Sequence, residues 1–161
     1  MSKPLHKIAI FPGSFDPITI GHVDIIRRSV DLFDQLIIAV GINSRKKYYF
    51  PLDVRLEWLQ LLFQDDERIK VAQYEGLTVD FCETVGAHYI IRGIRSSADF
   101  EYEKVIAQVN RDVSGTDLET ILMLSRPEYS HISSTVVKEI ILGGGNYTSF
   151  VPAVVRVNSP L

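Results

Sequence analysis

Short apolar runs alternate along the chain with segments of helical periodicity, and this alternation limits the possible folds more than any other feature of the sequence. The expected strands are residues 8–11, 36–40, 69–72, 89–91 and 118–124. The expected helices are residues 21–33, 53–63, 77–85, 98–111 and 134–142, with a final helical turn or two at 150–157. Strands that alternate with helices are typical of a parallel sheet. The sequence therefore predicts an α/β fold, a single doubly wound domain over residues 1–161 with helices on both faces.

The pattern within these segments also predicts what is buried. The run 36–40 is apolar throughout, as expected of a strand that is covered on both faces. Val105, Ile106 and Val109 are expected to point inward from their helix, and Cys82 is expected to be a small core residue. In such Rossmann-like sheets, ligands bind outside the carboxyl ends of the strands, near the point where the strand order reverses. Functional residues should therefore follow strands.

Charge and composition exclude several classes of protein. The 161 residues include 17 basic and 20 acidic side chains, a net charge of −3, which argues against a general nucleic-acid binder. The single cysteine excludes an internal disulfide framework. The sequence begins with no recognisable signal peptide, and no apolar stretch approaches the roughly 18 residues of a membrane span. We therefore expect a cytoplasmic protein without a membrane partner.

The first motif, P-G-S-F-D-P-I-T-I-G-H at residues 12–22, follows the first expected strand and opens the first expected helix. Thr19 suits the N-cap position, and Gly21 permits a close approach of a ligand to the backbone. His22 lies in the first helical turn, where free N–H groups and the helix dipole favour anions. The alternative is a capped helix start with an incidental histidine, but the length and position of the motif favour a functional site.

Two cationic segments follow later strands. Lys46 and Lys47 belong to the loop 43–47 after the second strand, and Arg92 and Arg95 follow the fourth. An Arg-Gly-x-Arg turn can present guanidinium groups and free N–H groups to a phosphate. The alternative for the first segment is a solvated loop. The alternative for the second is a surface ion-pair network with Asp99, Glu101 or Glu103.

The last motif, Y-S-H-I-S-S-T at residues 129–135, follows the fifth strand and opens the last clear helix. Ser133 or Ser134 suits the N-cap, which is the structural alternative to a phosphate site at the same helix N-terminus. His6 and His88 stand in no cluster with the spacing of metal ligands. The sequence therefore predicts no metal site built from protein side chains.

Three segments together resemble the phosphopantetheine adenylyltransferase family, in the nucleotidylyltransferase superfamily that is marked by a T/HxGH signature. T-I-G-H at 19–22 is similar to that signature and lies within the longer match at 12–22. I-R-G-I-R at 91–95 with D-F-E-Y-E at 99–103, and I-S-S-T-x-V-K at 132–138, are similar to two further family segments. The resemblance covers nearly the whole chain, from residue 8 to about residue 152.

The resemblance implies adenylyl transfer from ATP to 4′-phosphopantetheine, which yields dephospho-CoA and pyrophosphate in the penultimate step of coenzyme A biosynthesis. It implies direct in-line attack without a covalent enzyme intermediate. The catalytic residues that it implies are His22, Lys46 and Arg92. The ATP-binding residues that it implies are Ser14, Phe15, His22, Gly93, Ile94, Arg95, Glu103, Tyr129, Ser130, His131, Ile132, Ser133, Ser134 and Thr135. The acceptor-binding residues that it implies are Ser14, Lys46, Leu77, Thr78, Arg92 and Asn110.

The same resemblance implies several partners of the chain. Mg²⁺ would be bound through the phosphates of ATP, the chain would assemble as a homohexamer, and CoA would act as a feedback inhibitor. Two other functions stay open at this point. One is a nucleotidylyltransferase of the same superfamily that acts on another phosphorylated acceptor, and the other is a catalytically inactive nucleotide-binding regulator.

Overall fold

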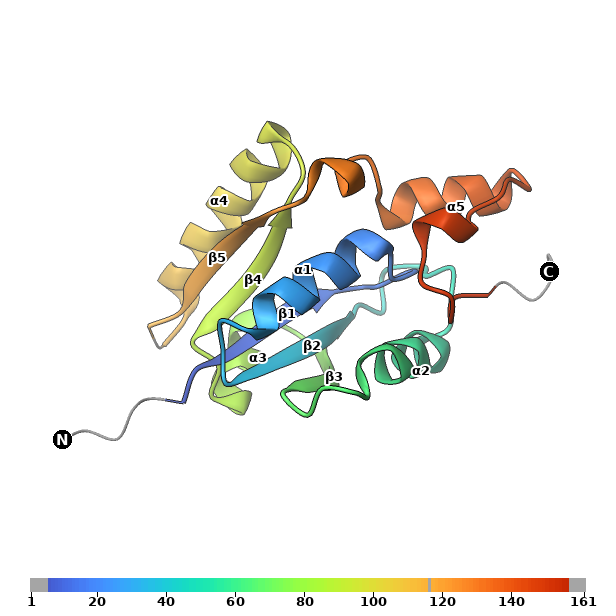
Figure 1. Ribbon diagram of the computed structural model, residues 1–161. Coiled ribbons are helices and arrows are strands. Elements are labelled where there is room, and N and C mark those ends of the chain that lie inside the picture. Colours follow the sequence, from blue (N-terminus) through green and yellow to red (C-terminus); the bar gives the residue numbers. More distant parts are fainter. Residues whose placement is uncertain (1–5, 116, 157–161) are drawn as a thin grey trace.

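Five parallel strands form one sheet in the order β3-β2-β1-β4-β5 (Figure 1). A computed structural model describes residues 6–115 and 117–156. The strands are β1 Ile8–Gly13, β2 Gln35–Ile42, β3 Ile69–Glu75, β4 Tyr89–Ile94 and β5 Glu119–Leu124. The helices are α1 Ile20–Val30, α2 Leu52–Phe63, α3 Thr78–Val85, α4 Ser97–Val113 and α5 Ser134–Leu142, with short 3₁₀ turns η1 Pro127–Tyr129 and η2 Thr148–Phe150. The predicted α/β class and doubly wound parallel sheet are confirmed.

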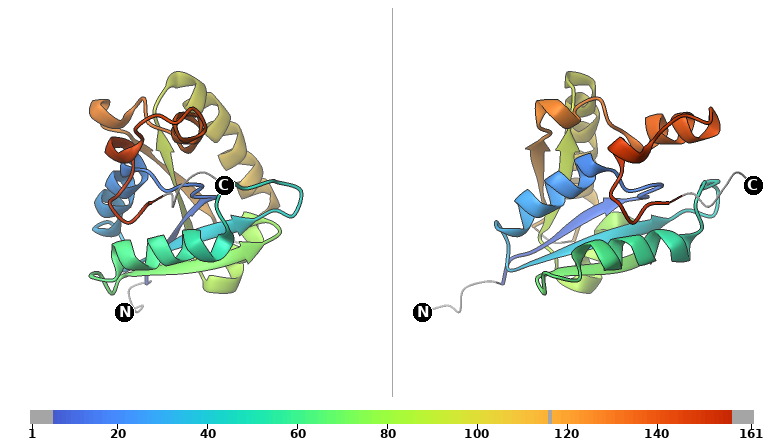
Figure 2. Two further views of the ribbon diagram at one scale, coloured as in Figure 1. Left: turned by 90° about the vertical axis from the view of Figure 1, so that its right-hand side faces the viewer. Right: turned by 45° about the vertical axis from the view of Figure 1, so that its right-hand side comes forward.

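Helices cover both faces of the sheet. Side chains alternate between the two faces along each strand, and apolar side chains on both faces need covering. Leu36, Ile38 and Val40 of β2 belong to one buried cluster with residues of α1, α2 and α5. Ile37 and Ala39 belong to a second cluster with residues of α3. The views of Figure 2 show α1 and α2 on one side of the sheet and α3 and α4 on the other. Double coverage explains why β2 is apolar throughout.

The central pair of strands separates toward its carboxyl end. β1 pairs with β2 along its whole length, from Ile8 to Gly13, but with β4 at only two positions, Ala9 with Tyr89 and Ile10 with Ile90. This is also the place where the chain reverses its direction through the sheet, since β2 and β3 lie on one side of β1 and β4 and β5 on the other. A crevice at this position is where ligands of such sheets bind.

Local signals set the helix ends. Thr19 caps α1, and Ser133 caps α5 by accepting the backbone N–H of Val136. Gly143 ends α5, so the glycine run acts as the expected helix stop. Cys82 is fully buried in the second cluster, which confirms its prediction as a core residue, and burial raises the pKa of its thiol to about 12.

Three expectations from the sequence need correction. β1 extends through Pro12 and Gly13, and β4 extends to Ile94, so Arg92 lies within a strand and not after it. Of the three side chains predicted to point inward from α4, Ile106 is partly buried, but Val105 and Val109 are about half exposed, and the one buried residue of that helix is Glu103. Helical periodicity shows that apolar residues share one side of a helix, but not which surface they pack against. Val105 and Val109 are turned away from the sheet.

The end of the chain also differs from its expectation. Instead of a helical turn or two at 150–157, the structure has the 3₁₀ turn η2, which ends at Phe150. Pro152 follows it and blocks helix continuation, because proline lacks the backbone N–H that a helix needs. Position 157 lies outside the described residues.

The docking of α5 depends on Val137, which is fully buried, whereas its neighbour Val136 is 40% exposed. We expect Val137→Ala to lower the free energy of unfolding by about 2 kcal/mol, because it removes buried methyl groups and leaves a cavity. Val136→Ala is the matched control and should change it by less than about 0.5 kcal/mol. Urea unfolding of the purified variants measures both values, and equal losses would contradict this account of α5 packing.

Candidate active site

The loop from β1 to α1 takes an unusual backbone path beside the crevice. Phe15 has a φ of +48°, in the left-handed region that costs a non-glycine residue about 1–3 kcal/mol unless the surroundings hold it. The Phe15 side chain is buried, and its ring centroid lies 5.8 Å from that of Phe11 and 5.4 Å from that of His22. These ring contacts hold the strained residue, with Ser14 beside it at the mouth of the crevice.

His22 is oriented by the cap of α1. The backbone N–H of Thr19 donates to Nδ1 of His22 at 3.1 Å, and the N–H of His22 donates to Oγ1 of Thr19 at 3.3 Å. Burial of the ring, and then the positive charges of Arg95 and Arg92, lower the pKa of His22 from 6.5 to about 4. The imidazole is therefore neutral at pH 7. Because Nδ1 accepts a hydrogen bond, the ring proton is on Nε2, and His22 offers a neutral donor.

Arg92 bridges the two separated strands. Its Nε and one terminal nitrogen donate to the two carboxylate oxygens of Glu103, at 3.0 and 2.8 Å. Its other terminal nitrogen donates to the carbonyl oxygen of Pro12 on β1 at 2.7 Å. Glu103 is only 6% exposed, so this pair is a charge-assisted contact in a largely dry position. The guanidinium group is thus held rigidly at the centre of the crevice.

Arg95 is oriented in a similar way from the loop after β4. Its Nε donates to Asp99 at 3.0 Å, and a terminal nitrogen donates to the carbonyl of Ile132, ahead of α5, at 3.4 Å. The ion pairs considered as the alternative for the two arginines are therefore present, with Glu103 and Asp99 as partners. They orient cationic groups that line a cavity, so the structural and the functional interpretations hold together.

Two cavities of about 450 and 440 Å³ meet at the crevice. The β2–α4 cavity opens between the loop after β2, the start of α3 and the helix α4. The α1–α5 cavity opens between the first turns of α1 and α5. Both are lined by one group of residues, which we call the seam: Pro12, Gly13, Ser14, Arg92 and Glu103. Two ligands bound in these cavities would meet at the seam.

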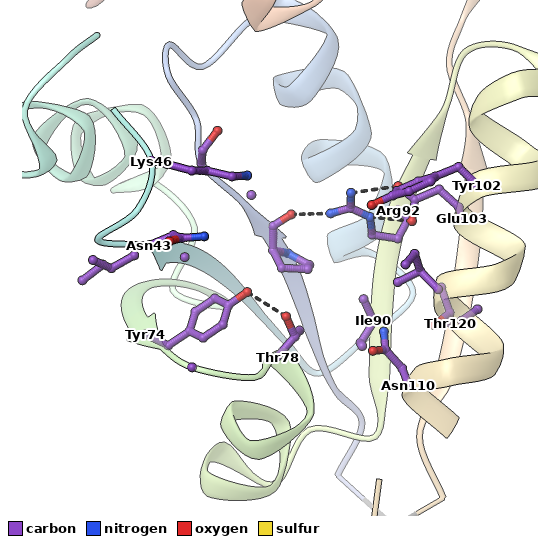
Figure 3. A pocket seen from close by; sticks show the side chains of 18 of the residues that line it. Asn43, Lys46, Tyr74, Thr78, Ile90, Arg92, Tyr102, Glu103, Asn110 and Thr120 are labelled. Atoms are coloured by element: carbon purple, nitrogen blue, oxygen red, sulfur yellow. Dashed lines mark hydrogen bonds and ion pairs between the residues drawn. The ribbon is translucent and has the colours of Figure 1, made fainter. Parts of the chain in front are cut away.

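Most of the residues that the sequence singled out line these cavities. Figure 3 shows Lys46 on one side of the β2–α4 cavity and Arg92 on the other. Predicted residues in this cavity are Ser14, Lys46, Thr78, Arg92, Glu103 and Asn110. Predicted residues in the α1–α5 cavity are Ser14, Phe15, His22, Arg92, Gly93, Arg95, Glu103, Tyr129, Ile132, Ser133, Ser134 and Thr135.

Four predicted site residues line neither cavity. Ile94 is a buried core residue, and Leu77 is 57% exposed at the N-cap of α3. The hydroxyl of Ser130 donates to the carbonyl of Pro127, and the His131 ring packs edge-on against Phe150. The structure therefore does not bring these four side chains together with the others.

Several residues that line the β2–α4 cavity were not predicted as site residues. Tyr74 lies near the end of β3, where its hydroxyl lies 2.9 Å from Oγ1 of Thr78, and Asn43 directly follows β2. The rule that ligands bind at the carboxyl ends of strands could have found both. Tyr102 and Ala107 also line the cavity from α4. Tyr102 belongs to the segment 99–103 but was given no role there, and no motif includes Ala107. Their place depends on how α4 packs.

Neither metal clusters nor membrane spans are found among residues 6–115 and 117–156. No group of three or more His, Cys, Asp or Glu side chains in these ranges could hold a metal ion. None of the helices described there is long and apolar enough to cross a membrane.

The lowered pKa of His22 predicts a pH dependence of stability. The unfolded chain takes up a proton on this residue as the pH falls through 6.5, whereas the folded chain resists protonation down to about pH 4. Wild type should therefore lose up to about 3 kcal/mol of stability relative to His22→Gln between pH 6.5 and pH 4. Urea unfolding at a series of pH values measures the difference between the two proteins. Parallel curves over this range would contradict the assigned shift.

Comparison with known proteins agrees with this geometry. Residues 10–140 match the cytidylyltransferase-like family model. The chain is 51% identical over 149 residues to a phosphopantetheine adenylyltransferase of Flavobacterium psychrophilum, covering 92% of this chain and 97% of the relative. It is also 51% identical to one of Christiangramia forsetii, with 93% and 98% covered.

Solved structures show the same fold. A Vibrio parahaemolyticus protein, provisionally named a nicotinate-nucleotide adenylyltransferase, superposes with a TM-score of 0.62 at 19% identity, covering 93% of this chain and 96% of that one. At 19% identity this similarity shows the fold alone, whereas the identities of 51% to the two relatives show the family. The chain belongs to the phosphopantetheine adenylyltransferase family of nucleotidyltransferases.

Proposed function

We propose that this chain transfers the adenylyl group of ATP to the phosphate of 4′-phosphopantetheine, producing dephospho-CoA and pyrophosphate. The observation that carries the proposal is the seam, where two cavities meet beside Arg92 and Ser14. ATP would occupy the α1–α5 cavity, with its phosphates near the N-terminus of α5 and the hydroxyls of Ser133 to Thr135. The relatives' shared name supports the acceptor and the place in coenzyme A biosynthesis.

The acceptor would lie in the β2–α4 cavity. Its long pantetheine arm needs apolar contact together with hydrogen-bonding partners for its amides. Ile106 and Ala107 supply the former, and Asn110 and Thr78 supply the latter. Lys46 and Arg92 would hold the terminal phosphate, which reduces its repulsion from the phosphates of ATP.

The chemistry would be a direct in-line displacement. A phosphate oxygen of the acceptor attacks the α-phosphorus of ATP, a new P–O bond forms, and the bond to pyrophosphate breaks. The enzyme's part is positioning and charge stabilisation, without a covalent intermediate. Nε2–H of His22 would donate to the α-phosphate as negative charge develops, and the neutral ring has its proton in place for this role.

Mg²⁺ would accompany ATP and screen the charge of the leaving pyrophosphate. Asp99 and Glu103, the carboxylates that line the α1–α5 cavity, are paired with Arg95 and Arg92. This donor set fits a metal that is held chiefly by the nucleotide phosphates and water. CoA contains the same pantetheine arm and would compete for the β2–α4 cavity as a feedback inhibitor. We further propose that residues 1–161 act as one catalytic domain in the cytoplasm.

Pyrophosphate release with a panel of phosphorylated acceptors tests the reaction. We expect turnover with 4′-phosphopantetheine to exceed that with nicotinamide mononucleotide and polyol phosphates. Turnover with one of these compounds and none with phosphopantetheine would show that the proposed acceptor is wrong. No turnover with any acceptor, while ATP still binds, would favour a nucleotide-binding regulator.

The role of His22 makes a separate prediction. His22→Ala should lower kcat on the order of 10²–10³-fold, because one donor to the developing charge is lost. His6→Ala is the control, since His6 is exposed and pairs with Asp34 at a distance from both cavities, and it should leave kcat unchanged. If His22→Ala folds and its kcat is unchanged, the role assigned to His22 is wrong.

The exposed stripe on α4 supports assembly with further copies of the chain, for which the resemblance implies a homohexamer. Val105, Val109 and Val113 are each about half exposed, and Leu124 on β5 is 70% exposed. Exposed apolar side chains that recur along one helix in this way are typical of an interface. Val105→Glu with Val109→Glu should dissociate the oligomer in analytical ultracentrifugation, whereas Leu32→Glu, at an exposed apolar residue in the turn after α1, should not. A monomeric wild type would end this proposal.

A further inference from the structure

Asp16 is a buried carboxylate that the proposed chemistry does not use. It is 1% exposed and accepts the backbone N–H groups of Tyr49 and Phe50, at 2.9 and 2.8 Å. Lys138 of α5 lies 3.3 Å from the same carboxylate. Asp16 therefore ties the β1–α1 loop to the end of the loop that follows β2. A buried charge is tolerated when it is paired and hydrogen-bonded in this way.

Arg55 holds the same two segments from α2. Arg55 is 2% exposed, and its guanidinium group donates from Nε to the carbonyl of Phe50 at 3.1 Å and from a terminal nitrogen to the carbonyl of Ser14 at 2.6 Å. We call Asp16 and Arg55 the clasp. Neither residue lines the two cavities, so the clasp is not part of the ligand-contacting surface.

A chain of contacts leads from the clasp to Lys46. The guanidinium carbon of Arg55 lies 4.3 Å from the centre of the Tyr48 ring. The Tyr48 hydroxyl accepts the N–H of Asn43 at 3.1 Å and donates to the carbonyl of Gly41 at 3.3 Å. The carbonyl of Asn43 accepts the N–H of Lys46 at 2.9 Å. Arg55 thus holds the segment 43–50, which contains Lys46, directly at Phe50 and through Tyr48 at Asn43.

We propose that Arg55 is a positioning residue for the phosphate of the acceptor, and that it acts by fixing Lys46 relative to Ser14. Lys46 has an exposed, flexible side chain, and its value for catalysis depends on where its backbone is held. Arg55 bonds directly to Ser14 of the seam and orders the loop of Lys46. The inference rests on the proposed function in one respect, which is that Lys46 binds the phosphate of the acceptor.

A double-mutant cycle on kcat/KM for phosphopantetheine tests the proposal. Arg55→Gln should lower kcat/KM by on the order of 10²-fold, as misplacement of a reacting group does. In a Lys46→Ala background the same change should cost less than about threefold, because its target is already absent. A purely structural role would give the full loss in both backgrounds, and that result would overturn the proposal.

Arg27→Gln is the matched control for loss of a stacked arginine. Arg27 lies 4.9 Å over the Phe63 ring and donates to the carbonyl of Leu62, so it also joins its neighbours to α2. This variant should show no coupling to Lys46→Ala. If Arg55→Gln does not fold, Arg55→Lys takes its place, since it keeps the charge but cannot bond both carbonyls at once. Its coupling should be smaller and have the same sign, and an absence of coupling would overturn the proposal.

Limited proteolysis gives a readout that does not need turnover. Arg45, Lys46 and Lys47 are trypsin sites within the loop, and cleavage there follows the population of opened loop. Arg55→Gln should speed cleavage at these sites about tenfold, and Arg27→Gln should not. Equal cleavage in wild type and Arg55→Gln would refute the clasp. A wild type that is inactive with phosphopantetheine would refute the proposed function instead, and the proteolysis would still decide the clasp.

Discussion

The limited pairing between β1 and β4 is the constraint on which the rest of the molecule depends. These strands share only two paired positions and then separate, although each continues to pair with its outer neighbour. Helices from the two sides of the sheet start at this divergence, so two cavities open on either side of one group of residues. The backbone groups there lack ladder partners, and Arg92 compensates by donating to Pro12.

The charges around this crevice are organised before any ligand arrives. Arg92 and Arg95 are paired with Glu103 and Asp99, which fixes the guanidinium planes and limits the charge that the empty site must bear. The same arginines help to keep His22 neutral, and Thr19 selects which ring nitrogen bears the proton. Preorganised donors of this kind avoid reorganisation when charge develops on a phosphate. The stability of the first helix and the chemistry proposed for it thus rest on one capping interaction.

Prediction from the sequence succeeded where the cause is local or periodic. The apolar runs identified the five strands, and Thr19 was identified as a cap because its hydroxyl suits a helix start. For the last helix the sequence left the choice between Ser133 and Ser134 open, and the structure has Ser133 as the cap. Prediction failed where packing decides. The stripe of Val105 and Val109 on α4 has the periodicity of a core face, but the helix turns it outward and buries Glu103, which pairs with Arg92. The sequence pattern of a helix is the same whether its apolar side packs against the sheet or is turned toward another surface.

The sequence by itself determined the α/β class, the parallel sheet and the location of polar motifs at the ends of strands. The motifs of His22, Lys46 and Arg92 lie at or near the carboxyl ends of strands, and the resemblance of the sequence to the family singled these residues out. Only the tertiary structure decided that the motifs divide between two cavities with a common seam, and that Ile94 lies in the core. It alone revealed Arg55, a helical residue without a motif, because its importance lies in two carbonyl groups that come from distant segments of the chain. Contacts of that kind depend on how the loops pack together, and spacing along the chain does not encode them.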